Sequence, residues 1–262
     1  MAIILMRTNA TPINFPVSFL KFFGALALAV VGICAGVSTN TSASITFSGS
    51  NAVQMLSASV TFSNSGTLLT VTLANTYTGD TPDQAHVLTG LFFSGADGLT
   101  PISATASAGS VEWIGTTSSP APGPGVLGEE WKYASGPHNP GGATAGIASS
   151  GYNNAFDVGN FASPGDMLDG SAYGILSTGY AGSDLDGLGS KTYIQPSMVF
   201  VFSSWSGSLS AITNVNFQYG TALSEPNLPA TLVPEPSSVV LVGVGLLGLL
   251  AIGRCKKQAI TW

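Results

Sequence analysis

A chain of 262 residues, of which 45% are hydrophobic and only 8% charged, is long enough for one domain with a substantial hydrophobic core. Its formal net charge of −6 at pH 7 argues against nucleic acid or an anionic membrane surface as a partner. The long apolar runs are confined to the two ends of the chain, so the hydrophobic composition does not indicate several membrane spans.

The first 43 residues have the order of a secretory signal peptide. Two basic residues are the only charges before residue 80, an apolar run covers residues 22–37, and residues 39–43 are small and polar. These are the three regions of a segment that signal peptidase removes. We expect cleavage after Ala43, which would expose Ser44. A non-cleaved N-terminal anchor is the alternative.

Residues 44–223 are predicted to form one β-rich ectodomain. Short alternating segments bounded by Gly, Pro, Asn, Asp or Ser recur, and no segment keeps a 3.6-residue apolar period over three turns. Residues 60–62 and 68–75, joined by a Gly-containing turn, predict a hairpin. The expected fold class is all-β: a single antiparallel β-sandwich, jelly-roll-like. Further strands are predicted over residues 44–47, 87–93, 102–108, 111–114, 130–134, 172–177, 198–202 and 212–219.

Three segments are predicted to contribute no strand to this domain. Residues 116–128 and 136–146 are rich in Pro and Gly and are expected to be loops. Residues 224–233 contain Pro226 and Pro229, and we expect them to form a stalk that separates the domain from the C-terminal segment.

Residues 44–233, which remain when both terminal segments are removed, differ from the whole chain in charge and cysteine content. This part holds twelve of the thirteen acidic residues but only two of the seven basic ones, Lys132 and Lys191, so its formal charge is −10. Cys34 and Cys255 both lie outside it. The domain is therefore expected to fold without a disulfide, even in an oxidising compartment.

The C-terminal segment, residues 234–257, combines three features in a fixed order. Pro234-Glu235-Pro236 comes first, and its prolines favour an extended backbone that a processing enzyme can bind. The uncharged run 239–253 follows and is predicted to be a transmembrane helix. It has 15 residues, against about 20 for a comfortable span, which suits a temporary anchor.

Basic residues close this segment. Arg254, Lys256 and Lys257 are expected to mark the cytoplasmic end of the span, because cations prefer that side of the membrane. The preceding domain would then lie outside the inner membrane.

This arrangement resembles the PEP-CTERM sorting signal of exosortase substrates in Gram-negative bacteria, on Pro234, Glu235, Pro236, the span and the basic end. Residues 58–75 and 87–93, with two later Gly-rich segments, are also similar to an ectodomain of such surface proteins. The resemblance implies exosortase and signal peptidase as processing enzymes and the inner membrane as a transient site. It further implies a final place on the cell surface or in an extracellular matrix, with exopolysaccharide or a biofilm as the surroundings.

A search for catalytic groups favours a domain that is not an enzyme. The sequence has no Gly-x-Ser-x-Gly and no His-Glu-x-x-His motif. Its two histidines, His86 and His138, are predicted at a strand start and in a Pro/Gly loop. Glu129 and Glu130 are adjacent and, in a strand, would point to opposite faces, so they would not act as a pair.

Two ligand classes remain open for the domain. Asp184 and Asp186, followed by a glycine, offer carboxylates on a tight turn and are candidate calcium ligands, although Asp-Gly is also ordinary turn chemistry. Trp113, Trp131 and Trp205 could stack on sugars if exposed, or pack in the core. The competing functions are therefore a secreted carbohydrate- or calcium-binding module and an extracellular enzyme.

Overall fold

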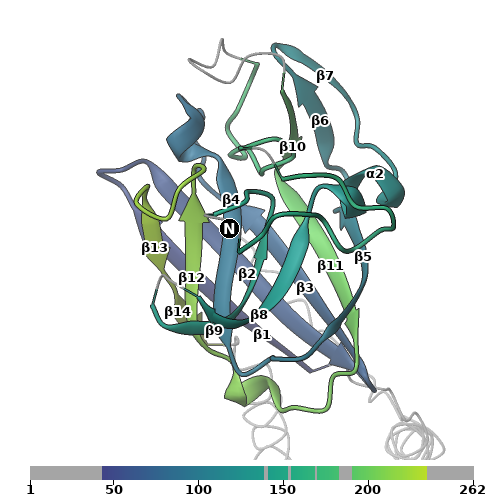
Figure 1. Cartoon of the computed structure of the whole chain (residues 1–262). Coiled ribbons are helices and arrows are strands. Elements are labelled where there is room, and N and C mark those ends of the chain that lie inside the picture. Colours follow the sequence, from purple (N-terminus) through teal and green to yellow (C-terminus); the bar gives the residue numbers. More distant parts are fainter. Residues whose placement is uncertain (1–42, 139–140, 153–154, 169, 183–190, 235–262) are drawn as a thin grey trace, which may run out of the picture. The chain divides into compact units, whose positions relative to one another are not determined.

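The computed structural model describes residues 43–138, 141–152, 155–168, 170–182 and 191–234 (Figure 1). The chain divides into two compact units, residues 1–41 and 42–262, and every described residue lies in the second. The named strand pairs in this unit are all antiparallel. The prediction of a domain built mostly of β-strands in antiparallel sheets is confirmed, and one short helix accompanies the strands in the described residues.

The largest sheet contains six strands in the order β14-β1-β2-β3-β11-β5. Apolar and small polar residues alternate along its central strands, as a sheet with one buried face requires. Its strands are β1 (Ala43–Asn51), β2 (Leu56–Ser65), β3 (Leu68–Asn75), β5 (Thr100–Ala106), β11 (Ser197–Ser203) and β14 (Thr231–Val233).

Two further sheets and three short helical elements complete the described part of the chain. The five-stranded sheet has the order β13-β12-β4-β9-β8, and the three-stranded sheet has the order β10-β6-β7. The first consists of β4 (Leu88–Ser94), β8 (Lys132–His138), β9 (Ala143–Ala148), β12 (Thr213–Tyr219) and β13 (Asn227–Pro229). The second consists of β6 (Val111–Ile114), β7 (Thr117–Pro120) and β10 (Thr192–Gln195). The helical elements are α2 (Pro124–Glu129) and the 3₁₀ turns η1 (Gln84–His86) and η2 (Leu209–Ala211).

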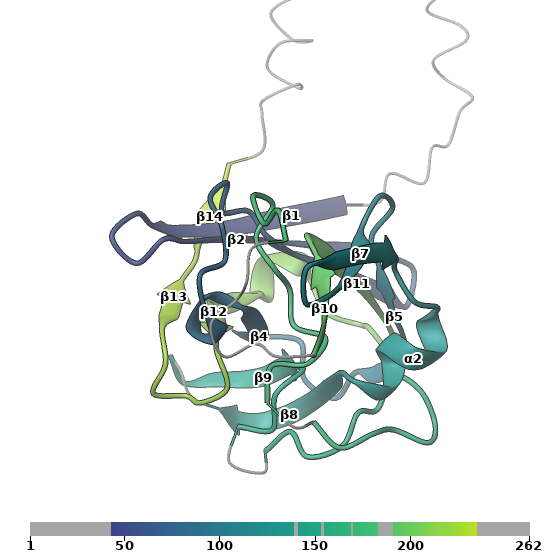
Figure 2. The ribbon, with the colours of Figure 1, turned by 90° about the horizontal axis from the view of Figure 1, so that it is seen from above.

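The main hydrophobic core lies between the six-stranded and the five-stranded sheet. Figure 2 shows β1 and β2 on one side of the domain and β8 and β9 on the other. Phe62 of β2 meets Phe93 of β4 with ring centroids 5.3 Å apart, and Tyr133 of β8 meets Phe202 of β11 at 5.1 Å. These edge-to-face contacts join the two sheets through large buried rings.

The predicted hairpin is present as β2 and β3. Ser59 pairs with Ala74, Thr61 with Thr72, and the turn passes through Gly66 at a φ of +60°. A glycine takes this left-handed conformation without the steric cost that other residues meet. Alternation and turn chemistry therefore predicted this part of the sheet correctly.

Other local predictions were wrong. Residues 116–128 contain β7 and α2 rather than a loop: β7 is an edge strand, where Pro120 is tolerated, and Pro124 opens α2 in the first turn, where a missing N–H costs nothing. Residues 136–146 overlap β8 and β9. Residues 172–177 form no strand, because Tyr173 adopts a φ of +56° and Ile175 makes only isolated bridges.

The predicted stalk is also wrong for the last part of residues 224–233. Asn227–Pro229 and Thr231–Val233 are the strands β13 and β14 of two different sheets. Pro226 and Pro229 indicated a linker from the sequence, but both strands lie at sheet edges, where proline is compatible with pairing on one side. The folded domain therefore extends to Val233.

Candidate sorting and processing site

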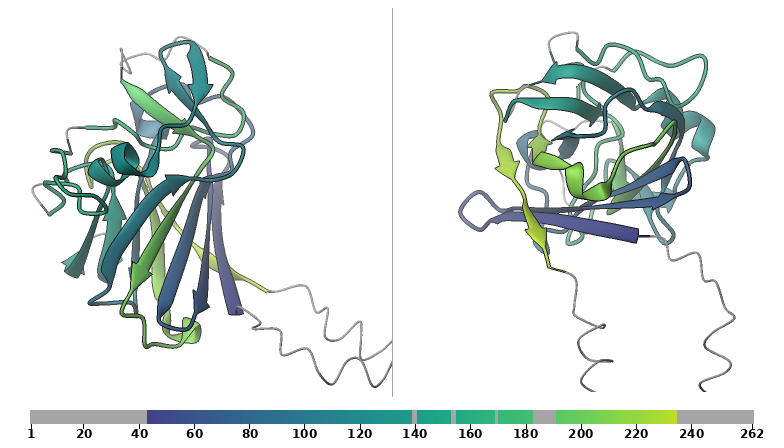
Figure 3. Two further views of the ribbon diagram at one scale, coloured as in Figure 1. Left: turned by 90° about the vertical axis from the view of Figure 1, so that its right-hand side faces the viewer. Right: turned by 90° about the horizontal axis from the view of Figure 1, so that it is seen from below.

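The C-terminal end of the domain crosses from one sheet to the other. Leu228 of β13 pairs with Phe217 of β12. The chain then turns at Ala230, and four residues after Leu228, Leu232 of β14 pairs with Phe47 of β1. The Ala230 N–H donates to the Val215 carbonyl at 2.9 Å. We call residues 227–233 the C-terminal strap. The right-hand view of Figure 3 shows it spanning the edges of the two sheets.

One buried side chain anchors the C-terminal strap. Leu228 is only 5% exposed and belongs to the main core, whereas Leu232 is 57% exposed. Gly49 of β1 makes room for the crossing, because a Cβ atom there would lie 2.8 Å from the Pro229 carbonyl oxygen and 2.9 Å from Leu228 Cγ. Any larger residue at position 49 must push the C-terminal strap away from β1.

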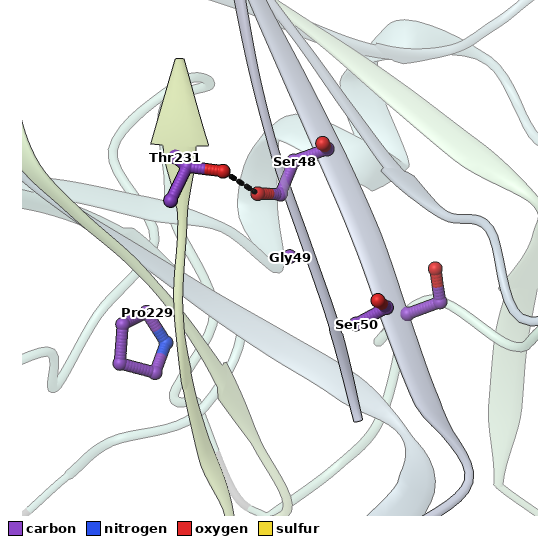
Figure 4. A pocket seen from close by; sticks show the side chains of 6 residues that line it. Ser48, Gly49, Ser50, Pro229 and Thr231 are labelled. Carbon is purple, nitrogen blue, oxygen red and sulfur yellow. Dashed lines mark hydrogen bonds between the residues drawn. The ribbon is translucent and has the colours of Figure 1, made fainter. Parts of the chain in front are cut away.

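A polar hollow of about 390 Å³ lies beside this crossing (Figure 4). Hydroxyl-bearing and small residues from both sides line it: Ser48, Gly49, Ser50, Ser57, Pro229 and Thr231. The Thr231 hydroxyl donates to the Ser48 carbonyl at 3.5 Å. Since no titratable side chain lines the hollow, it offers hydrogen bonds but no acid, base or charge.

The Pro-Glu-Pro tripeptide begins where strand pairing stops. The last pair of the β1–β14 ladder is Thr46 with Val233, and the next residue is Pro234, which is exposed and outside any strand. Proline has no N–H to continue a ladder. Glu235 and Pro236 lie outside the described residues, as do Arg254, Lys256 and Lys257.

The predicted signal-cleavage point lies on the neighbouring strand. Ala43 pairs with Asn64 and Ser44 with Ser63 at the start of β1. Ala43 is exposed, and it is three residues from Thr46, the partner of Val233, or about 10 Å along the strand. The two points at which the chain is predicted to be processed therefore sit at one edge of the same sheet.

The candidate calcium ligands fall outside the part of the chain that the structure describes. Asp184 and Asp186 lie in the segment 183–190, outside the described residues. Among the residues that are described, no group of three or more His, Cys, Asp or Glu side chains is placed to hold a metal ion. Asp166, which opens the segment 166–170 with its own Asp-Gly pair, is exposed and accepts a hydrogen bond from the Met167 N–H at 2.8 Å.

The tryptophans do not form a sugar platform. Trp131 and Trp205 are buried in the main core, so neither ring face can stack on a ligand. Trp113 is half-buried: its Nε1 donates to Gln195 Oε1 at 2.7 Å, and its ring packs edge-to-face on Tyr180. These contacts give all three indoles packing roles.

The titratable groups with shifted pKa values are also explained by packing and local pairing. Burial raises the pKa of the Tyr133 and Tyr193 hydroxyls to about 12. A hydrogen bond from Lys132 lowers the pKa of the exposed Asp157 carboxyl. The two histidines are separate candidates from the sequence, and His86 Nδ1 lies 2.6 Å from Oδ1 of Asp83, the residue that caps the turn η1. The side chain of His138 lies outside the description.

Sequence reasoning found the motif but missed the C-terminal strap that presents it. The available signal was the alternation of Leu228, Ala230 and Leu232 with polar or small residues, which is short and interrupted by Pro229. No helix in the described part of the chain is long and apolar enough to cross a membrane. The predicted span 239–253 lies outside that part.

Comparison with known protein families identifies the same C-terminal sorting signal that the sequence predicted. Residues 232–257 match the family model of the PEP-CTERM protein-sorting motif, a sorting signal that exosortase recognises. The match begins at Leu232, so the motif and the C-terminal strap share Leu232 and Val233. No curated protein and no solved structure matches the chain significantly.

Proposed function

We propose that this PEP-CTERM sorting-domain protein is exported, anchored transiently in the inner membrane, and then trimmed by exosortase to leave a non-catalytic β-sandwich, jelly-roll-like domain at the cell surface or in the extracellular matrix. The sorting motif supports export and the exosortase step. Two facing antiparallel sheets with a shared core support the sandwich.

The observation that carries the proposal is the junction between the β1–β14 ladder and the motif. Pairing ends at Val233, and Pro234 follows directly, exposed at a sheet edge. An enzyme that binds its substrate as an extended segment can therefore approach the motif while the domain stays folded. A cut after Val233 leaves every described strand in the product, whereas a cut before Thr231 removes β14.

Strand pairing at the same sheet edge sets the order in which we expect the two cleavages to occur. The bond between Ala43 and Ser44 lies inside the β1–β2 ladder, where it is less accessible than a bond in an unpaired segment. We expect signal peptidase to act before the first residues of β1 pair, and exosortase to act afterwards on the folded domain. The surroundings proposed for the product are exopolysaccharide or a biofilm matrix.

The proposal is tested by replacing Pro234-Glu235-Pro236 with three alanines in the full chain. Alanine restores the backbone N–H, frees φ and favours helix, so the extended segment that the enzyme binds is lost. We expect export to continue while C-terminal trimming stops and the protein stays in the inner membrane. A matched variant, Pro122→Ala in an irregular segment, should be trimmed normally. Trimming of the triple variant at the parental rate would refute the proposal.

A further inference from the structure

The outer face of the six-stranded sheet carries a regular array of hydroxyl groups. Register places the outward residues of β1 directly opposite those of β2, and each of these residues is Ser or Thr. The pairs are Ser44 with Ser63, Thr46 with Thr61, Ser48 with Ser59, and Ser50 with Ser57. The residues between them, such as Phe47, Val60 and Phe62, point into the core.

The array continues across the remaining strands of the sheet. Thr61 pairs with Thr72 of β3, Thr72 with Val199 of β11, and Val199 with Thr105 of β5. We call this surface the hydroxyl face. Its further outward residues are Leu68, Thr70, Ala74, Ser197, Val201, Ser103 and Thr231. None of the residues named for it is charged, aromatic or an amide.

These hydroxyls retain hydrogen-bonding capacity toward a ligand. Thr46 and Thr61 share one hydrogen bond of 2.8 Å, and Ser57 and Thr76 share one of 2.7 Å. Each hydroxyl has one donor and two acceptor sites, so one such bond leaves further sites on both partners. Neighbouring strands repeat every 4.7–4.9 Å and same-face residues every ~6.8 Å, which spreads the groups in rows over the sheet.

The polar hollow lies at one margin of the hydroxyl face. Ser48, Ser50 and Ser57 belong to both, and Thr231 of the C-terminal strap forms the opposite wall. In Figures 2 and 3 no described strand or helix lies over the hydroxyl face. A ligand that spreads over the rows can thus seat one end in a concave site of about 390 Å³, which is within the size range of small-ligand pockets.

Charge selects the class of ligand. Residues 44–233 hold twelve acidic and two basic residues, so the domain repels polyanions over much of its surface. The hydroxyl face carries none of those acids and offers many small donors and acceptors. A neutral polymer with hydroxyl groups of its own can form hydrogen bonds here without meeting a charge that it cannot pair.

We propose that the hydroxyl face and its hollow bind a neutral polysaccharide. The inference rests on the proposed export, which brings the domain into contact with extracellular polymers. Each uncharged hydrogen bond contributes little by itself, so binding depends on many groups along one chain. Small side chains let the polymer lie close to the sheet, and Val199 and Val201, which stand within the rows between hydroxyl-bearing neighbours on β3 and β5, provide apolar contact for the ring faces of the sugars.

The test is affinity electrophoresis of the full chain, purified in detergent, through native gels that contain dextran, hydroxyethyl cellulose or anionic alginate. The variant Thr61→Val with Thr72→Val removes two central hydroxyls but keeps shape and strand preference. The control, Thr117→Val with Thr213→Val, makes the same change at exposed positions on β7 and β12. Loss of one hydrogen bond costs about two- to tenfold in affinity, so the first variant should bind about tenfold more weakly.

The proposal predicts retardation by at least one neutral polymer, weaker retardation of the Thr61/Thr72 variant, and no effect of the control. It is overturned if neither neutral polymer retards the parent, or if the two variants behave alike. It is also overturned if the Thr61/Thr72 variant loses self-association instead, because the face would then join two copies. C-terminal trimming is measured separately, so failure here leaves the sorting proposal standing.

Discussion

Leu228 and Leu232 allow the role of the C-terminal strap to be measured with two identical substitutions. Both leucines lie in the C-terminal strap, four residues apart. Leu228 packs in the main core and is 5% exposed, whereas Leu232 is 57% exposed. If the strap is part of the cooperative fold, Leu228→Ala should destabilise the domain far more than Leu232→Ala.

The size of the effect follows from burial. Removing a buried leucine side chain and leaving a partly collapsed cavity costs about 2–5 kcal/mol, and we expect about 3 kcal/mol for Leu228. An exposed substitution usually changes the free energy of unfolding by about 0.5 kcal/mol or less. For a domain of this size, 1 kcal/mol corresponds to about 2–4 °C in Tm. Leu228→Ala should therefore lower Tm by about 6–12 °C, and Leu232→Ala by about 2 °C or less.

Thermal unfolding of the full chain in detergent, followed by tryptophan fluorescence, measures this difference. Trp131 and Trp205 are buried in the same core, so their emission should shift when the core opens. Equal Tm values for the two variants would show that the C-terminal strap is detached from the cooperative unit. The junction at Val233 would then no longer explain how the motif is presented.

Two further predictions concern the same domain. Gly49→Val should lower Tm by several degrees and expose the C-terminal strap to proteolysis, because a Cβ at position 49 meets Pro229. The control Ser50→Val, at the next and exposed position, should have neither effect. Resistance of the Gly49 variant to protease would contradict this prediction. The raised pKa of Tyr133, about 12 against about 10 in an unfolded chain, means that its contribution to stability is complete below pH 10 and is lost as pH rises through 12. The urea midpoint should therefore fall less between pH 8 and pH 11 for Tyr133→Phe than for the parent. An equal fall in both proteins would show that the buried Tyr133 hydroxyl does not cause this loss of stability.

The sequence predicted the elements whose local signals agree with their tertiary setting. Alternating residues on both sides of Gly66 specify the β2–β3 hairpin, and the same alternation over residues 111–114 gives β6 with the predicted bounds. In the hairpin the turn residues and the buried face specify the same structure. The β-rich character of the domain followed from many such short segments.

The missed elements depend on neighbours that are distant in sequence. Pro229 looked like part of a linker, yet the C-terminal strap forms because Leu228 packs into the main core and Gly49 leaves room for the crossing. The hydroxyl face has the same origin. Alternating Ser and Thr were visible in each strand, but only register brings Thr61, Thr72 and Thr105 into one row.

The central claim is that the folded domain ends where processing begins, and intact mass spectrometry of the protein recovered outside the inner membrane tests it most directly. We predict a species that starts at Ser44, retains the C-terminal strap through Val233, and lacks residues 239–257. A species that still contains residues 239–257, or one whose C-terminus lies before Thr231, would contradict the account.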